Sequence, residues 1–168
     1  MALFKNGGFA DDVWMILAPG DTVPPTGHVI LSREQWLAQR DGLTGFGAPL
    51  GLRLEPGVDI EPILPDLPRF ALVALAFPKF SDGRAFSTAN ILRSEHGFKG
   101  EIRAVGEVLF DQLQLMQRCG FDAFEILHEP TLRALQGGRN PGVNNFYQPG
   151  QGPEIPAGTR PWARKRAS

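Results

Sequence analysis

Cysteine is nearly absent from this chain, in which Cys119 is the only example among 168 residues. One thiol excludes an internal disulfide framework and any zinc or iron–sulfur site built from several cysteines of the chain. The three histidines, His28, His96 and His128, lie far apart in the sequence and lack metal-ligand spacing. The sequence therefore predicts no metal site, and no cofactor is evident from it.

The chain also lacks a large excess of positive or negative charge, long apolar runs and nucleotide-binding motifs. The formal net charge of −1 argues against a broad electrostatic surface for nucleic acid. No apolar run approaches the roughly 20 residues that span a bilayer, and the soon acidic N-terminus, MALFKNGGFADDVW, does not resemble a secretory signal. Neither G-x-G-x-x-G nor a Walker A sequence occurs. We expect a cytoplasmic protein that binds neither nucleic acid nor membrane.

What the chain does contain is ordinary for a globular protein. Hydrophobic residues make up 42% and charged residues 21%, and 168 residues are enough for one domain with a real core. The 20 glycines and 15 prolines mark turns and dominate residues 140–168, which end in a basic cluster. We predict one domain over residues 1–139 and an extended or disordered tail over residues 140–168.

Strands and helices alternate most clearly over residues 70–135. The run FALVALAF at residues 70–77 is almost wholly apolar, as in a central strand that is covered on both faces. A helix capped by Ser81 or Ser87 follows and ends near residue 95. Further strands are predicted at residues 101–105 and 122–127, and further helices at residues 107–118 and 130–135.

The N-terminal half carries shorter signals of the same kind. Ser32 and Gln35 form a capping-box pattern at the start of a helix over residues 33–40. The sequence LGLRL at residues 50–54 alternates as a half-buried strand does. Short strands are also predicted at residues 12–17 and 29–31, and a short helix or turn at residues 58–67.

The alternation favours right-handed βαβ units with parallel strands. The predicted fold is therefore a single α/β domain with a βαβαβ core and a mostly parallel sheet, in a half-barrel-like or three-layer arrangement.

The turn after the central strand, PKFSDGR at residues 78–84, is the first candidate site, because α/β folds place ligands where their strands end. Lys79, Arg84 and Arg103 supply positive charge in this prediction. Ser87 and nearby helix amides donate hydrogen bonds, and Asp82 orients an arginine. The site would hold a small anion such as sulfate, phosphate or a carboxylate. The alternative is an ordinary turn in which Arg84 pairs with Asp82 and Ser87 only caps a helix.

Two carboxylates, Asp82 and Asp111, are the candidates for acid/base catalysis. Asp111 falls inside a predicted helix, where Asp is unfavourable unless a polar contact compensates it. The alternative for Asp111 is a structural network with Arg103 or Arg84. Cys119 precedes Gly120 at a helix end, where thiolates are not activated, so we interpret it as a small buried residue rather than a redox group.

Several stretches carry a family resemblance: FPKFSDGR at residues 77–84, S-x-A-x-x-L-R at 87–93, G-F-x-G-E-I-R-A-V-G at 97–106, DQL at 111–113 and RCGFDAF at 118–124. Over about residues 70–127 the chain resembles a bacterial family of unknown molecular function, the domain of unknown function 934 family. Its members are described as oxidoreductases involved in sulfite reduction, and their genes commonly accompany those for sulfite reductase. The resemblance implies a place in sulfate assimilation and cysteine biosynthesis, and it implies no mechanism.

Three roles remain open at this point. The first is an accessory protein of assimilatory sulfite reduction, which binds a small anion, sulfite reductase or another sulfate-assimilation protein. The second is a small α/β enzyme of sulfur assimilation, such as an oxidoreductase, with Asp82 or Asp111 as acid/base. The third is a non-catalytic structural partner subunit, which an exposed apolar patch would favour.

Overall fold

The computed structural model describes residues 2–139 and 141. The strands are β1 (Ala2–Lys5), β2 (Gly8–Ala10), β3 (Trp14–Ile16), β4 (His28–Ser32), β5 (Leu50–Leu54), β6 (Phe70–Phe77), β7 (Glu101–Gly106) and β8 (Ala123–Ile126). The helices are α1 (Arg33–Gln39), α2 (Arg84–Ser94), α3 (Leu113–Arg118) and α4 (Glu129–Gln136), with 3₁₀ helices η1 (Glu61–Arg69) and η2 (Phe110–Gln112). Each strand from β4 to β8 is followed by a helical segment, as βαβ units require.

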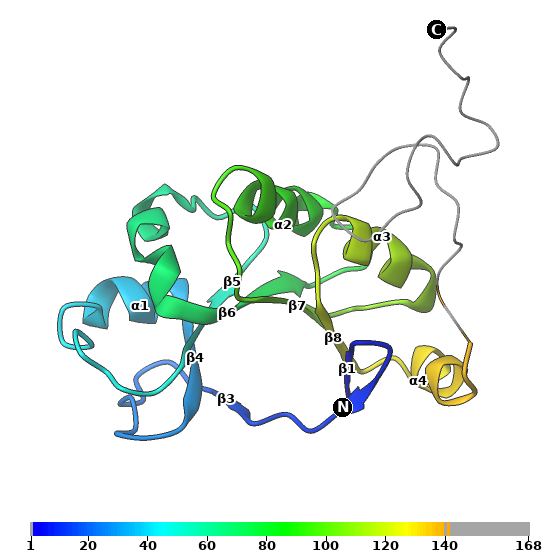
Figure 1. Cartoon of the computed structure of the whole chain (residues 1–168), viewed down its shortest axis with the longest axis horizontal. Coiled ribbons are helices and arrows are strands. Elements are labelled where there is room, and N and C mark those ends of the chain that lie inside the picture. Colours follow the sequence, from blue (N-terminus) through cyan, green and yellow to red (C-terminus); the bar gives the residue numbers. More distant parts are fainter. Residues whose placement is uncertain (1, 140, 142–168) are drawn as a thin grey trace, which may run out of the picture.

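The strands form one sheet in the order β2-β1-β8-β7-β6-β5-β4-β3. Strands β3 to β8 are parallel, whereas β1 is antiparallel to both β8 and β2. The sheet is curled as a half-barrel, and the helices lie on its outer side (Figure 1). The predicted α/β fold with a mostly parallel sheet is therefore confirmed in its half-barrel form. The predicted tail lies outside the described residues, except for residue 141.

The two edges of this sheet are joined by three residues. β2 and β3 are the opposite edge strands, yet only residues 11–13 separate them in the sequence. In a flat sheet of this width the edges would lie about 34 Å apart, whereas the chain from Ala10 to Trp14 reaches at most about 14 Å. The sheet must therefore curl, and residues 11–13 cross its open side (Figure 1). We call residues 11–13 the strap.

The capping box at the start of α1 forms as predicted. The Ser32 hydroxyl accepts a hydrogen bond from the Gln35 backbone N–H at 3.2 Å, and the Gln35 side-chain oxygen accepts from the Ser32 backbone N–H at 2.8 Å. Two otherwise unpaired backbone donors of the helix start are thereby satisfied. The Gln35 amide also donates to the Ala18 carbonyl at 2.7 Å, which ties α1 to the segment after β3.

Strand β6 is buried on both faces, in agreement with its apolar sequence. Val73 and Leu75 face the main core, which fills the space between the sheet and its helices. Leu72, Ala74 and Ala76 face the opposite, concave side, where a smaller apolar cluster lies. Because successive side chains of a strand point to opposite faces, one continuous apolar run supplies both clusters.

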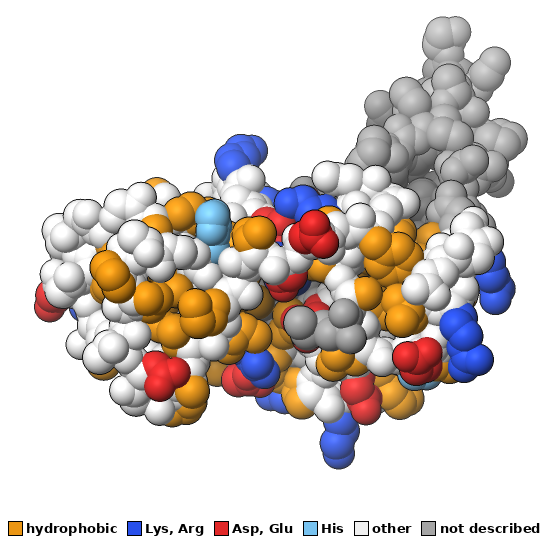
Figure 2. Space-filling model, turned by 90° about the horizontal axis from the view of Figure 1, so that it is seen from below, with side chains coloured by type: hydrophobic (Ala, Val, Ile, Leu, Met, Phe, Trp, Pro, Cys, Tyr) orange, Lys and Arg blue, Asp and Glu red, His pale blue; other side chains and the backbone are white. Residues whose placement is uncertain are grey.

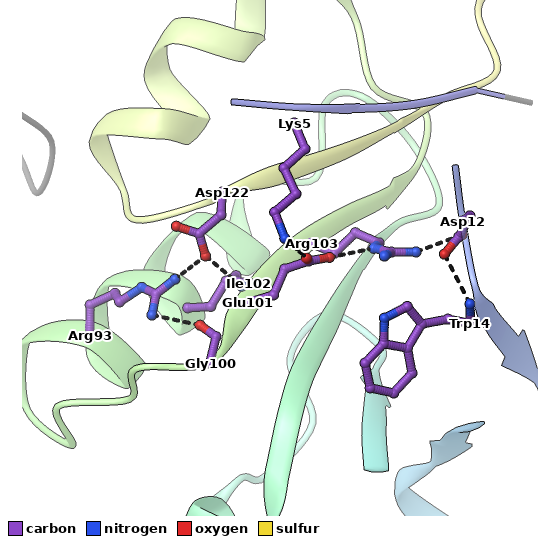
Figure 3. Close-up of polar contacts among 9 residues, drawn as sticks. All are labelled: Lys5, Asp12, Trp14, Arg93, Gly100, Glu101, Ile102, Arg103 and Asp122. Atoms are coloured by element: carbon purple, nitrogen blue, oxygen red, sulfur yellow. Dashed lines mark hydrogen bonds and ion pairs between the residues drawn. The ribbon is translucent and has the colours of Figure 1, made fainter. Parts of the chain in front are cut away.

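Arg93 of α2 fixes the amino ends of β7 and β8. Its guanidinium donates to the backbone oxygens of Phe98 at 2.6 Å and Gly100 at 2.9 Å, and it pairs with Asp122. Asp122 also accepts from the backbone N–H of Ile102 in β7 at 2.9 Å (Figure 3). These bonds satisfy loop carbonyls that would otherwise lack partners, and they hold the two strands that carry the concave face.

Two helix starts differ from the prediction. The N-cap of α2 is Gly83, so neither Ser81 nor Ser87 caps that helix. The helix expected from residue 107 begins only with η2 and α3, and Glu107 lies before it. The Glu107 carboxylate instead accepts from the Phe80 backbone N–H at 2.8 Å. Glu107 therefore stabilises the turn after β6 and does not belong to a helix.

The N-terminal hairpin of β1 and β2 was not predicted. Its turn holds Asn6 at φ 54° and Gly7 at φ 80°, both in the left-handed region. Asn-Gly is the pair that two-residue hairpin turns favour for this reason. In the part of the chain that the structure describes, no helix is long and apolar enough to cross a membrane.

Candidate functional site

The turn after β6 places Asp82 and Arg84 in a closed ion pair. The Arg84 guanidinium donates to both Asp82 carboxylate oxygens, at 2.9 and 2.6 Å, and the Arg84 backbone N–H donates to Oδ1 at 3.2 Å. The side-chain hydrogen bond from Arg84 lowers the pKa of Asp82 to about 2, and the same bond raises the pKa of Arg84. The bidentate pair uses donors that a bound anion would need.

The rest of the turn is exposed. Lys79 and Ser87 lie on the surface, and the Arg84 side chain is 62% exposed. Asp111 is also exposed. The structure therefore brings Lys79, Asp82, Arg84 and Ser87 into one stretch of surface, and anion binding there stays a prediction.

Arg103, the fifth predicted residue, does not join this turn. It lies in the middle of β7, points to the concave face and is only 2% exposed. Its Nε donates to Glu101 at 2.8 Å and its Nη1 donates to Asp12 of the strap at 2.7 Å (Figure 3). Glu101 also pairs with Lys5 of β1 at 2.5 Å. A buried guanidinium requires such compensation, because an unpaired charge in the interior is costly.

The strand register places a second arginine in line with Arg103. Arg53 of β5 pairs with Ala74 of β6, which in turn pairs with Arg103. Neighbouring strands lie about 4.8 Å apart, so the two arginines flank Ala74 on the same face of the sheet. The methyl group of Ala74 leaves space between them.

A pocket of about 180 Å³ occupies this space on the concave face. It is lined by Asp12, Trp14, Ile16, Ile30, Arg53, Ala74, Arg103, Val105 and Glu125. The Trp14 ring packs close over Gly51, since a Cβ at that glycine would lie 3.1 Å from the ring and 2.9 Å from Ile30. We call this hollow the concave pocket.

Arg53 also belongs to a second pocket, of about 400 Å³, at the carboxyl ends of β3, β4 and β5. Its Nε donates to Glu55 at 3.0 Å, while its terminal Nη groups form no hydrogen bond with the described residues. Ligands of parallel α/β sheets bind at the carboxyl ends of the strands. Arg53 lines both the pocket at that edge and the concave pocket.

Glu125 is the carboxyl group of the concave pocket with a raised pKa. Burial is the main cause, Arg103 and Arg53 oppose it, and the Asp12 carboxylate adds to it. The described residues give the Glu125 side chain no hydrogen-bond partner and no ion pair. A half-buried carboxyl with a raised pKa that faces a pocket is a functional-site signal, and here the signal falls on Glu125 rather than on Asp82.

The concave pocket therefore has room for a small polar molecule between the guanidinium groups of Arg53 and Arg103 and the carboxyl group of Glu125. Metal binding gains no support within residues 2–139 and 141, where no group of three or more His, Cys, Asp or Glu side chains could hold an ion. Cys119 is partly buried, and that burial raises the pKa of its thiol, with Arg118 opposing the shift. This environment suits a structural cysteine.

Of the nine residues that line the pocket only Arg103 was predicted as a site residue, and the other polar or aromatic ones, Asp12, Trp14, Arg53 and Glu125, were not. Two signals were available in the sequence. Arg53 and Glu125 are charged residues inside otherwise apolar strands, LGLRL and DAFEIL. Each needed a reason to lie there, because a buried charge is costly without a partner. The contact of Asp12 with Arg103 joins residues 91 positions apart, and no local pattern indicates it.

Comparison with known families gives one result. Residues 51–157 match the model of a family described as a bacterial protein of unknown function, DUF934. The match covers more than half of the chain, so the chain belongs to this family. No curated protein matches the chain.

Proposed function

We propose that this DUF934 member is a cytoplasmic accessory protein of assimilatory sulfite reduction, and that it binds a small anion in the concave pocket. The observation that carries the anion proposal is the row Arg53–Ala74–Arg103, in which two guanidinium groups flank a small residue beside Glu125, whose side chain has no partner among the described residues. The place in sulfur metabolism rests on the family resemblance.

The chemistry of the pocket assigns different roles to its charged groups. Arg103 has two carboxylate partners, Asp12 and Glu101, whereas Arg53 has one, Glu55, and it supplies the main attraction through its Nη groups. Glu125 helps only when it is protonated, because it then donates a hydrogen bond instead of repelling the anion. Anion affinity should therefore rise as the pH falls through the pKa of Glu125.

A direct binding experiment compares the concave pocket with the turn after β6. The melting temperature is measured with increasing sulfite, sulfate and formate, for the wild type and for Arg53→Gln and Arg84→Gln. A ligand that binds only the folded state raises the melting temperature with concentration. We expect a rise that Arg53→Gln abolishes and Arg84→Gln retains. A rise that only Arg84→Gln abolishes would place the anion at the turn, and no rise in any of these proteins would reject the proposal.

A genetic experiment tests the pathway separately. A deletion strain is grown on sulfate or on cysteine, and it is complemented with the wild type or with Arg53→Gln. We expect cysteine-dependent growth that the wild type corrects and the Arg53 variant does not, although the variant is folded. Normal growth of the deletion strain on sulfate would contradict a role in assimilation.

A second candidate function, a partner subunit, is favoured by the exposed apolar edge of the sheet. Val13, Met15 and Ile16 at strand β3 are 65%, 52% and 50% exposed. Apolar side chains gather over the half of the molecule that holds β3 and β4 (Figure 2). An edge strand with exposed apolar residues is a template for another chain. A pull-down with sulfite reductase that compares the wild type with Met15→Lys tests this role. Equal capture of the wild type and the variant would exclude the β3 edge as the binding surface.

A further inference from the structure

The strap carries one side chain into the concave pocket. All three strap residues are exposed as whole residues, but the side chain of Asp12 itself is only 20% exposed and lines the pocket. Its Oδ2 accepts from Arg103 at 2.7 Å, and its Oδ1 accepts from the Trp14 backbone N–H at 3.2 Å (Figure 3). One carboxylate thus ties the strap to the buried arginine and to the first residue of β3.

Asp12 is chemically the ligand that an anion pocket would hold. A carboxylate accepts charge-assisted hydrogen bonds from a guanidinium in the same way as a small oxoanion does. It approaches Arg103 from the open side of the sheet, because the strap crosses that side (Figure 1). Glu101, by contrast, lies on the same strand as Arg103 and also pairs with Lys5.

We propose that Asp12 is an internal occupant of the anion site, and that a bound anion displaces it from Arg103 and releases the strap, an inference that rests on the proposed anion-binding function. Arg103 keeps its bond to Glu101 throughout, so the displacement exchanges one anion for another and leaves no bare charge in the interior. The freed Asp12 carboxylate becomes solvated at the surface.

The charges that face Asp12 come from several elements. Arg103 and Glu101 belong to β7, Arg53 to β5, Glu125 to β8 and Lys5 to β1. With Asp12 in place, the ligand meets Arg53, which presents its Nη groups while its Nε is paired with Glu55. With Asp12 displaced, both arginines face the ligand, so Asp12 lowers the affinity of the site for any anion that reaches it.

Asp12→Asn removes the competing charge and retains the shape of the side chain. Removal of one nearby like charge should strengthen anion binding roughly tenfold. Asp11→Asn is the matched control, because it makes the same change in net charge at the neighbouring, exposed position. Sulfite and formate are the probes, and the dissociation constants are measured by calorimetry at one ionic strength.

Amide hydrogen exchange gives a second readout on the wild type itself. The Trp14 N–H is protected by Asp12, so release of the strap should speed its exchange when the anion is bound. Asp12→Asn should exchange faster at Trp14 even without the anion, because its neutral amide oxygen is a weaker acceptor for the Trp14 N–H than the carboxylate, whereas Asp11→Asn should not. If Asp12→Asn does not fold, the wild-type measurement with and without sulfite decides alone.

The outcomes separate this inference from the proposed function. Anion binding by the wild type, with equal affinities for Asp12→Asn and Asp11→Asn, overturns the internal-occupant role and leaves the anion site standing. Binding that slows or does not change exchange at Trp14 overturns strap release. No binding by the wild type or by Asp12→Asn rejects the anion site and the inference together.

Discussion

The turn after β6 and the concave pocket both contain an arginine paired with carboxylates, yet they differ in their surroundings. In the turn, Arg84 and Asp82 are neighbours in the sequence and their pair is open to water. In the pocket, Arg103 is buried and is held by Asp12 and Glu101 from different parts of the chain. Water screens the attraction within the exposed pair and would solvate either ion if its partner were removed. The buried Arg103 has no such solvation and depends on its carboxylate partners.

The comparison shows why a dense charged motif is a poor guide to a site. Lys79, Asp82 and Arg84 cluster in the sequence because a turn is exposed and tolerates charge. Charged residues inside strands are fewer, and the strand register places Arg53, Arg103 and Glu125 on one face of the sheet. The isolated charges therefore form the pocket, and the clustered ones form a surface turn.

The largest expected difference concerns the loss of each arginine. Arg103→Met leaves Asp12 without its ion-pair partner and Glu101 with Lys5 as its only cation among the described residues, and it should cost about 3 kcal/mol of unfolding free energy. Arg84→Met removes an exposed pair and should change stability little. Urea unfolding of both variants measures the difference. A loss for Arg103→Met no larger than that for Arg84→Met would contradict the burial of its network.

Added methyl groups should also separate the two regions. Gly51→Ala would bring a Cβ to within 2.9 Å of Ile30 and 3.1 Å of Trp14, so we expect a loss of about 1–3 kcal/mol from overpacking. The displaced Trp14 would also narrow the pocket and weaken anion binding. Gly83→Ala meets no atom within 4 Å and should change stability by less than about 0.5 kcal/mol. Equal losses for the two variants in thermal unfolding would show that Gly51 is not tightly packed.

Much of the fold follows from local patterns because its elements satisfy themselves locally. The Ser32 and Gln35 capping box fixes the start of α1, and the apolar run at residues 70–77 is the buried strand β6. The predicted cap of α2, Ser81 or Ser87, is wrong because the N-cap residue is Gly83, which has no side chain to form a cap hydrogen bond. The pair Asn6-Gly7 is itself a hairpin-turn signal, so the N-terminal hairpin is predictable from local sequence.

The pocket was only partly predictable for a different reason. Arg103 lies inside a predicted strand, and Glu101, two positions earlier, shares its face, so this one partner follows from local spacing. Its second partner, Asp12, depends on the curl of the whole sheet, which brings the strap across β7. The alignment of Arg53 with Arg103 depends on the register of three strands. Register and curl are set by packing, so no short motif encodes them.

Asp82 and Glu125 should make the stability of the fold depend on pH in opposite directions. The lowered pKa of Asp82 contributes stability that is present above 3.8 and is lost as the pH falls through about 2. The raised pKa of Glu125 contributes stability that is present below 4.5 and is lost as the pH rises through the higher folded value. Relative to the wild type, Glu125→Gln should therefore gain stability as the pH rises, and Asp82→Asn should gain it only in strong acid.

Melting temperatures of the three proteins across pH 2 to 8, at constant salt, measure these dependences. Anion affinity of the wild type should fall with rising pH, and that of Glu125→Gln should change less. A wild-type curve that Glu125→Gln reproduces above pH 4.5 would show that Glu125 titrates as an exposed carboxyl does.

The smallest expected effect is the response of the two arginine networks to salt. The Debye length is about 10 Å at 0.1 M salt and about 3 Å at 1 M, so exposed charges are screened far more than buried ones. In a double-mutant cycle of Arg84→Gln and Asp82→Asn, the coupling in melting temperature should be small at low salt and disappear at high salt. The cycle of Arg103→Met and Asp12→Asn should keep its coupling, because these side chains are shielded from ions by the sheet and the strap. If the coupling between Arg103 and Asp12 weakens with salt as much as that between Arg84 and Asp82, water and ions already reach Arg103. The two regions would then differ only in how far apart their paired residues lie in the sequence.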